Sequence, residues 1–154
     1  MQNFVSVPFT AQKHSGLSEV NGMAKFSRAG IVFEFESKLL GLISEGVKEA
    51  RIPTAEILDV IFKKAILRRK AWIEIRTRSL AAMADVPNSD GKVSLRIKPV
   101  DFELAQNAVA KLQADLADFE LDQTKQASEL PPTHTPVSVL FDASEDETQE
   151  LKNE

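Results

Sequence analysis

Apolar and polar residues alternate along several short stretches of the chain. In one of them, Ile31, Phe33 and Phe35 share one face while Glu34 and Glu36 share the other. A period of two residues is typical of β-strands that bury one face. It predicts seven short strands, two of them within residues 56–78 and the others at 3–9, 22–27, 30–37, 47–52 and 93–97.

The segment 56–78 predicts a hairpin in which a basic turn joins two strands. The alternation places one side of each strand against the core, and these positions are Ile57, Asp59 and Ile61 on the first strand and Ala71, Ile73 and Ile75 on the second. Trp72 then points outward. The segments 10–21 and 38–46 break the alternation and are predicted to be irregular.

The period changes after residue 100. Apolar residues then recur about four positions apart, which predicts a helix over 102–120 with the stripe Leu104, Ala108, Leu112, Leu116 and Phe119. A terminal helix of this kind can cover the open end of a β-sandwich or barrel. The predicted fold class is therefore mainly β, with a seven-stranded antiparallel sandwich or barrel capped by a C-terminal α-helix.

Two regions with different compositions divide the 154 residues. Residues 1–121 hold the predicted elements and carry seventeen bases against fifteen acids. Residues 122–154 carry eight acids against two bases, a net charge of −6, and have few large apolar side chains. Such a segment buries too little apolar surface to offset the entropy of ordering. We expect one domain over 1–121 and a disordered acidic tail over 122–154, with the stretch 136–142 left open.

Composition narrows the classes of function. The chain has no cysteine, which excludes disulfides and thiolate chemistry. We find no apolar run long enough to span a membrane, and we expect a cytoplasmic protein for which contact with a membrane surface stays open. A nearly neutral body argues against nucleic acid as a partner.

Catalytic signals are weak. The two histidines, His14 and His134, lack neighbours at a useful spacing, and no glycine-rich nucleotide motif occurs. The carboxylates of Glu34 and Glu36 could serve acid–base chemistry or bind Ca²⁺, although cross-strand pairing with Lys48 or Arg51 is the more ordinary interpretation. We therefore expect a protein that is not an enzyme and has no cofactor or metal.

Two groups of residues are candidates for binding. The first is basic, lies in the most positively charged stretch of the body (net +6 over 63–78), and consists of Lys63, Lys64, Arg68, Arg69 and Lys70. It predicts a recognition module that meets an acidic protein or an anionic membrane surface. A masking contact of the acidic tail with these bases is a further hypothesis.

The second group is aliphatic and consists of Leu39, Leu40, Leu42 and Ile43. These side chains could mediate self-association or membrane contact, or they could pack under the sheet. They support the alternative interpretation, a structural protein that assembles into homo-oligomers.

Several stretches resemble a bacterial branch of the pleckstrin-homology-like (PH-like) fold that has no assigned function. They are 30–36 (GIVFEFE), 51–57 (RIPTAEI), 75–80 (IRTRSL), 86–87 (VP) and 93–97 (VSLRI) followed by the helix. The resemblance covers residues 1–121 and implies a scaffold for binding lipid headgroups, peptides or protein surfaces. The lipid-binding members carry bases in the first interstrand loop, where this chain offers only Lys13 and His14.

Overall fold

The computed structural model describes residues 3–13, 17–67 and 69–129. Within these residues it contains seven strands and one α-helix, namely β1 (Val5–Lys13), β2 (Ser18–Ser27), β3 (Gly30–Leu39), β4 (Ile43–Pro53), β5 (Ile57–Ala65), β6 (Lys70–Thr77), β7 (Val93–Ile97) and α1 (Phe102–Glu129). Short 3-10 turns lie at Thr54–Glu56, Ala81–Met83 and Pro99–Asp101. The predicted class, mainly β with seven antiparallel strands and a C-terminal helix, is confirmed.

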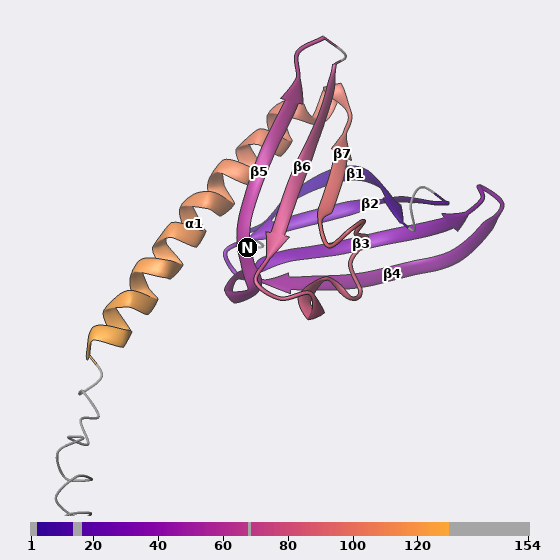
Figure 1. Cartoon of the computed structure of the whole chain (residues 1–154). Helices are drawn as coiled ribbons and strands as arrows, with labels where there is room; N and C mark the ends of the chain where they lie inside the picture. Colours follow the sequence, from indigo (N-terminus) through magenta and orange to yellow (C-terminus); the bar gives the residue numbers. More distant parts are fainter. Residues whose placement is uncertain (1–2, 14–16, 68, 130–154) are drawn as a thin grey trace, which may run out of the picture. The chain divides into compact units, whose positions relative to one another are not determined.

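The strands form one sheet in the order β4-β3-β2-β1-β7-β6-β5, and every neighbouring pair is antiparallel. Two meanders, β1–β4 and β5–β7, are therefore joined where β1 meets β7. Among the described residues, that junction has a single residue pair, Thr10 with Arg96. Because the junction is short, the two halves diverge, and the strands β5–β7 cross those of β1–β4 (Figure 1).

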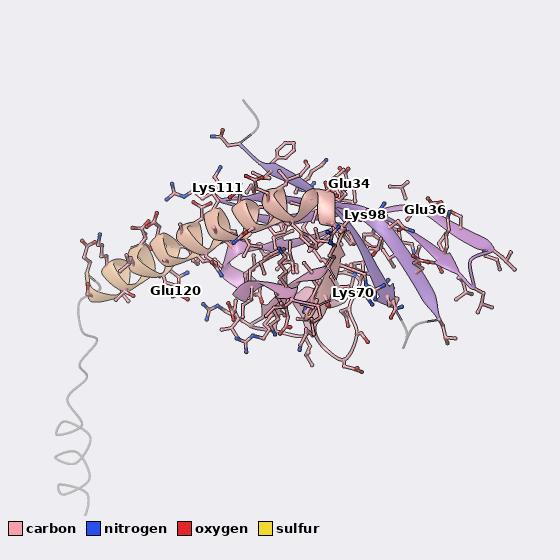
Figure 2. All side chains as sticks on the ribbon, turned by 90° about the horizontal axis from the view of Figure 1, so that it is seen from above. Glu34, Glu36, Lys70, Lys98, Lys111 and Glu120 are labelled. Carbon is pink, nitrogen blue, oxygen red and sulfur yellow. The ribbon has the colours of Figure 1, made fainter. Side chains whose placement is uncertain are left out.

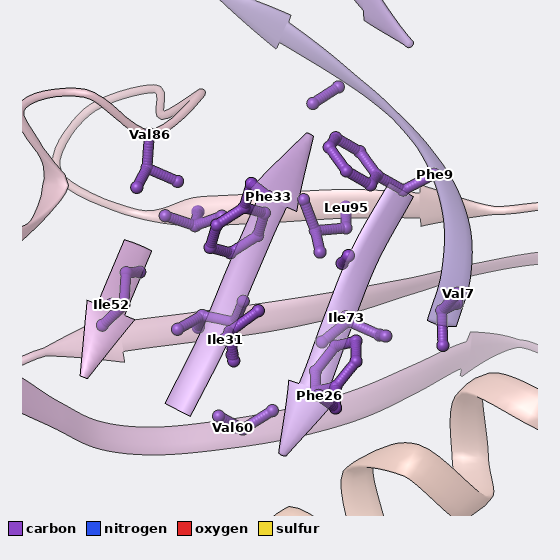
Figure 3. Packing of buried hydrophobic residues seen from close by; sticks show 14 of the residues in the cluster. Val7, Phe9, Phe26, Ile31, Phe33, Ile52, Val60, Ile73, Val86 and Leu95 are labelled. Atoms are coloured by element: carbon purple, nitrogen blue, oxygen red, sulfur yellow. The ribbon is translucent and has the colours of Figure 1, made fainter. Parts of the chain in front are cut away.

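The core lies between the two halves of the sheet. Figure 3 shows Phe33 from one half close to Leu95 from the other, with Ile31, Ile73 and Val60 in the same layer. The rings of Phe9 and Phe33 meet edge to face with their centroids 6.1 Å apart. The inward positions of the alternating strands thus form one continuous apolar cluster, as a sheet that is solvated on its other face requires.

The first hairpin is longer than its apolar pattern predicts. β1 continues to Lys13 and β2 begins at Ser18, so most of the segment 10–21 is strand and not irregular. Ala11 and Val20 are buried in this extension and pair with each other. Thr10, Gln12 and Glu19 occupy the outer face, so the alternation continues with small inward side chains that the sequence pattern underweighted.

One half of the predicted 56–78 hairpin has the opposite face assignment. A bulge between Ile57 and Asp59 shifts the register of β5, so that Val60 is buried while Asp59 and Ile61 lie on the outer face. A one-residue shift exchanges the two faces of a strand. The predicted core positions Asp59 and Ile61 are therefore wrong, whereas Ile57 is buried as predicted.

The segment 38–46 is the end of a hairpin and not a loop. β3 runs to Leu39, β4 starts at Ile43, and Leu40 and Gly41 take positive φ values of 52° and 72° in the turn. β4 is one edge of the sheet, and its first seven residues are exposed. The strand predicted over 47–52 is thus confirmed and begins four residues earlier.

Helix α1 packs through small residues. Ala105, Ala108, Val109 and Leu112 are buried, and the side-chain amide of Gln113 donates a hydrogen bond to the carbonyl oxygen of Val60. Leu104, which the predicted stripe placed in the core, is 41% exposed. Ala108 and Leu112 of the predicted stripe are in the core and Leu116 packs against it, so the prediction is wrong only for Leu104 among these four.

The helix continues nine residues beyond the predicted end, to Glu129. Residues 1–121 form one compact unit and residues 122–154 a second. Within the second unit, residues 122–129 are helical, which corrects the prediction that disorder begins at 122. Glutamine, lysine, alanine and glutamate favour helix propagation once a helix has been nucleated. The rest of the predicted tail, including 136–142, lies outside the described residues.

Candidate functional site

The turn between β5 and β6 carries two large aliphatic side chains. Ile66 and Leu67 are 96% and 95% exposed. Basic residues flank them, with Lys64 before the pair and Arg69 and Lys70 after it. We call residues 64–67, 69 and 70 the basic hairpin tip, and they lie at the end of the β5–β6 hairpin (Figure 1).

The predicted basic group does not converge on one point. The Nζ atom of Lys63 lies 2.8 Å from a carboxylate oxygen of Glu74 on the outer face of the sheet. Lys64 lies on the other face, where its Nζ is 5.3 Å from the centroid of the Phe102 ring. Arg69 lies in the turn with a φ of 44°, and Arg68 lies outside the described residues. Lys70 begins β6 and lines a cavity on the outer face.

That cavity lies at the junction of the two meanders, and we call it the seam cavity. It has a volume of about 500 Å³ and is lined by residues of β1, β2, β6, β7 and the loop before β7. Arg96 lines it between Thr10 of β1 and Trp72 of β6, with which it pairs on either side. The seam cavity thus lies where β1 and β7 diverge.

The seam cavity is positively charged. Lys70, Lys92 and Arg96 line it, and Glu19 is its one acid. The Nζ atom of Lys92 also lies 3.3 Å from a carboxylate oxygen of Glu74. Among the described residues, Lys70 and Arg96 have no acidic partner. Two cations are therefore available to a bound anion without the loss of an existing ion pair.

Neutral side chains complete the walls. The half-buried Trp72 lies beside Pro87, and together they give the cavity an apolar side. Thr10, Ser89 and Ser94 line it with hydroxyl groups. Trp72 points outward, as the alternation predicts when Ile73 and Ile75 are buried. Its ring is thus placed to contact a ligand.

Glu74 organises the outer face beside the cavity. The hydrogen bond from Lys63 and the hydrogen bond and charge of Lys92 hold the pKa of Glu74 below its usual value of 4.5, against the opposing effect of burial. The carboxylate is therefore ionised at neutral pH and fixes both ammonium groups. It keeps Lys63 away from the hairpin tip and Lys92 at the rim of the cavity.

The aliphatic group at the β3–β4 turn is exposed. Leu40, Leu42 and Ile43 are 70%, 90% and 60% exposed, and Leu39 is 37% exposed. Packing of these side chains under the sheet, one of the predicted alternatives, is therefore wrong. The two hairpin ends point in different directions, so they are separate surfaces (Figure 1).

The paired carboxylates of β3 each have a polar partner, but not the predicted ones. Glu34 lies 2.5 Å from the ammonium of Lys25 on β2, and Glu36 accepts a hydrogen bond from Ser44. Figure 2 labels both glutamates. Lys48 and Arg51 bond instead to Glu45 and Glu49 of their own strand. His14 and His134 lie outside the described residues. Among the residues that the structure describes, no group of three or more potential metal ligands occurs.

Two features of the site could not be predicted from the sequence. The alternation of β7 identifies Arg96 as outward, yet its position beside Thr10 depends on the pairing of the first strand with the last. Ile66 and Leu67 continue the apolar pattern of β5, and only the position of the turn shows that they leave the sheet. The first feature depends on long-range strand pairing, and the second on where the β5–β6 turn falls.

Comparisons with protein-family models, with curated proteins and with solved structures found no match. A search of the described part of the chain likewise found no helix of the length and apolarity needed to cross a membrane.

Proposed function

We propose that this protein is a non-enzymatic recognition module that binds an anionic membrane surface through the basic hairpin tip. The observation that carries the proposal is the almost complete exposure of Ile66 and Leu67 between basic residues. An aliphatic pair with flanking lysines and arginines matches a bilayer with anionic lipids, where apolar side chains enter the interface and cations remain among the headgroups.

The expected free energies favour a reversible contact with the membrane. Burial of one large aliphatic side chain contributes about 1.5 to 3 kcal/mol, and each base near an anionic surface adds about 1 kcal/mol. The tip offers Ile66 and Leu67 together with Lys64, Arg69 and Lys70. Loss of translational freedom and partial insertion reduce the total. We therefore expect weak binding that decreases as salt screens the charges.

A membrane suits the tip better than an acidic protein does. A stable protein interface buries about 800 Å² on each partner and needs a complementary shape. Two side chains at the end of a hairpin present a small area, and a lipid surface adapts to any shape. The choice between the two predicted partners therefore falls on the membrane.

Affiliation with the PH-like fold is part of the proposal. It is supported by the order of the elements, seven antiparallel strands followed by a helix. A binding role does not follow from the fold, since one fold hosts many functions. It rests on the residues of the tip.

Co-sedimentation of the full chain with vesicles tests the proposal. We expect binding to vesicles that contain phosphatidylserine, little binding to phosphatidylcholine alone, and weaker binding at high salt. The double variant Ile66→Ser, Leu67→Ser should lose most of the binding. The matched variant Leu40→Ser, Leu42→Ser changes the other exposed hairpin end and should bind as well as the unmodified chain. Equal binding by both variants would refute the role of the tip.

A second candidate function is self-assembly through the β3–β4 hairpin. The observation that favours it is the exposure of Leu42 (90%), in the turn before the edge strand β4, and of Val47 (80%), on that strand. Exposed edges with apolar side chains pair readily with another chain. Light scattering should then show an oligomer that survives high salt and dissociates in the Leu42→Ser variant, whereas a monomer at all concentrations would exclude this function.

A further inference from the structure

We infer that the seam cavity is a binding site for a phosphate monoester. The inference does not depend on the membrane proposal, because the cavity opens on the outer face of β1, β6 and β7, whereas Ile66 and Leu67 lie in the β5–β6 turn. Lys70 belongs to both surfaces, since it ends the hairpin tip and lines the cavity.

Charge identifies the ligand as an anion. Lys70, Lys92 and Arg96 face the cavity together with Glu19, an excess of two positive charges. A phosphate monoester carries about two negative charges near neutral pH, so it neutralises the site. A single carboxylate would neutralise only one of these two positive charges. Within the described part of the chain, Lys70 and Arg96 have no ion pair to give up on binding it.

The donor groups also favour phosphate. A guanidinium presents a planar set of N–H groups that matches two phosphate oxygens, and ammonium groups add charge from other directions. Arg96 supplies the first and Lys70 supplies the second, while Lys92, at the other end of the β6–β7 ladder, stays bonded to Glu74. Thr10 and Ser94 line the same cavity with hydroxyl groups that can donate to the remaining oxygen.

Size and shape indicate that the phosphate is part of a larger molecule. A cavity of about 500 Å³ falls within the range of small-ligand sites, which is about 300 to 1,000 Å³, and exceeds the volume of a lone phosphate ion. Trp72 and Pro87 form an apolar wall where the carbon part of an ester can pack. The ester can come from a soluble metabolite or from a lipid headgroup, because both present the same group.

The single tryptophan of the chain provides the readout, because Trp72 lines the cavity. The full chain is titrated with glycerol 3-phosphate at constant ionic strength while its fluorescence is recorded. We expect a saturable change that inorganic phosphate reproduces at higher concentration. Arg96→Gln should weaken the apparent affinity by about tenfold, the usual effect of removing one charge-assisted contact.

Arg51→Gln is the matched control. Arg51 lies on β4, pairs with Glu49 and does not line the cavity, so the variant removes the same charge elsewhere. The affinity of the Arg51→Gln variant for glycerol 3-phosphate should equal that of the unmodified chain. The inference is overturned if glycerol 3-phosphate gives no saturable signal, or if both arginine variants weaken binding equally, since bulk charge would then explain the effect. Thermal denaturation of each variant verifies that it is folded.

Vesicles distinguish the two sources of the ester. Vesicles containing phosphatidic acid present a phosphate monoester, and vesicles with an equal fraction of phosphatidylserine present anionic lipid without one. Arg96-dependent preference for phosphatidic acid would support a lipid headgroup, and saturable binding of the soluble ester without that preference would support a metabolite. The Ile66→Ser, Leu67→Ser variant should still bind glycerol 3-phosphate, so failure of the membrane proposal is distinguishable from failure of this one.

Discussion

Lys63 and Lys64 are neighbours in the chain, yet their ammonium groups lie on opposite faces of strand β5. Lys63 bonds to Glu74 on the outer face, 2.8 Å away, whereas Lys64 stands 5.3 Å from the ring centroid of Phe102. Successive side chains of a strand point to opposite sides. A run of bases in a β-hairpin therefore supplies two surfaces, and on the outer face Lys70 joins Arg96 at the seam cavity.

The register shift in β5 makes a direct prediction. Val60→Lys should reduce the free energy of unfolding by about 3 kcal/mol or more, because it buries an unpaired charge. Ile61→Lys should cost less than about 1.5 kcal/mol, since Ile61 is on the outer face opposite Glu74. Urea denaturation of both variants measures the difference. Similar losses, or a larger loss for Ile61→Lys, would mean that the predicted faces were right and the bulge is misplaced.

The packing of helix α1 makes a second prediction. Leu112→Ala should reduce the free energy of unfolding by about 2 to 5 kcal/mol, because Leu112 is 1% exposed in the core. Leu104→Ala, eight residues away on a partly exposed position, should cost about 1 kcal/mol or less. Equilibrium denaturation of both variants tests this packing, and a loss below about 0.5 kcal/mol for Leu112→Ala, or a similar loss for Leu104→Ala, would contradict it.

Gly30 is expected to be intolerant of a side chain. Its φ of 131° is rare for other residues, and an added Cβ would lie 2.2 Å from the carbonyl oxygen of Ile52. Backbone strain alone costs about 1 to 3 kcal/mol, and the backbone contact adds to it. Gly41, with a φ of 72° and open space around it, is the control. Thermal denaturation should show a clearly larger loss for Gly30→Ala than for Gly41→Ala, and equal losses would place the strain in the φ angle alone.

Glu74 predicts a pH dependence of stability. Its pKa in the folded protein is lowered mainly by the hydrogen bond from Lys63, so its contribution is fully present above the ordinary value of 4.5 and is lost as pH falls through the lowered pKa. Each partly exposed ion pair should contribute about 1 kcal/mol or less. At neutral pH, Glu74→Gln should therefore be less stable than the unmodified chain. The difference should shrink as pH falls below 4.5, and a constant difference down to acidic pH would contradict this role.

The sequence predicted the class, the strand count and the adjacent strands at 22–27 and 30–37, because these depend on alternation within short segments. It predicted the outward Trp72 for the same reason. It placed Asp59 and Ile61 in the core because a bulge leaves no mark in the alternation. The junction of Thr10 with Arg96 joins residues 86 positions apart and follows from strand order, which local patterns do not determine.

Insertion of the hairpin tip into an anionic bilayer is the central claim, and a label at the tip tests it most directly. The chain has no cysteine, so Ile66→Cys can be labelled at one site with an environment-sensitive fluorophore, and Leu42→Cys provides the same label on the other exposed hairpin end. On addition of vesicles containing phosphatidylserine, the label at position 66 should shift to shorter wavelength while that at position 42 stays unchanged. No shift at position 66, or equal shifts at both positions, would contradict the account.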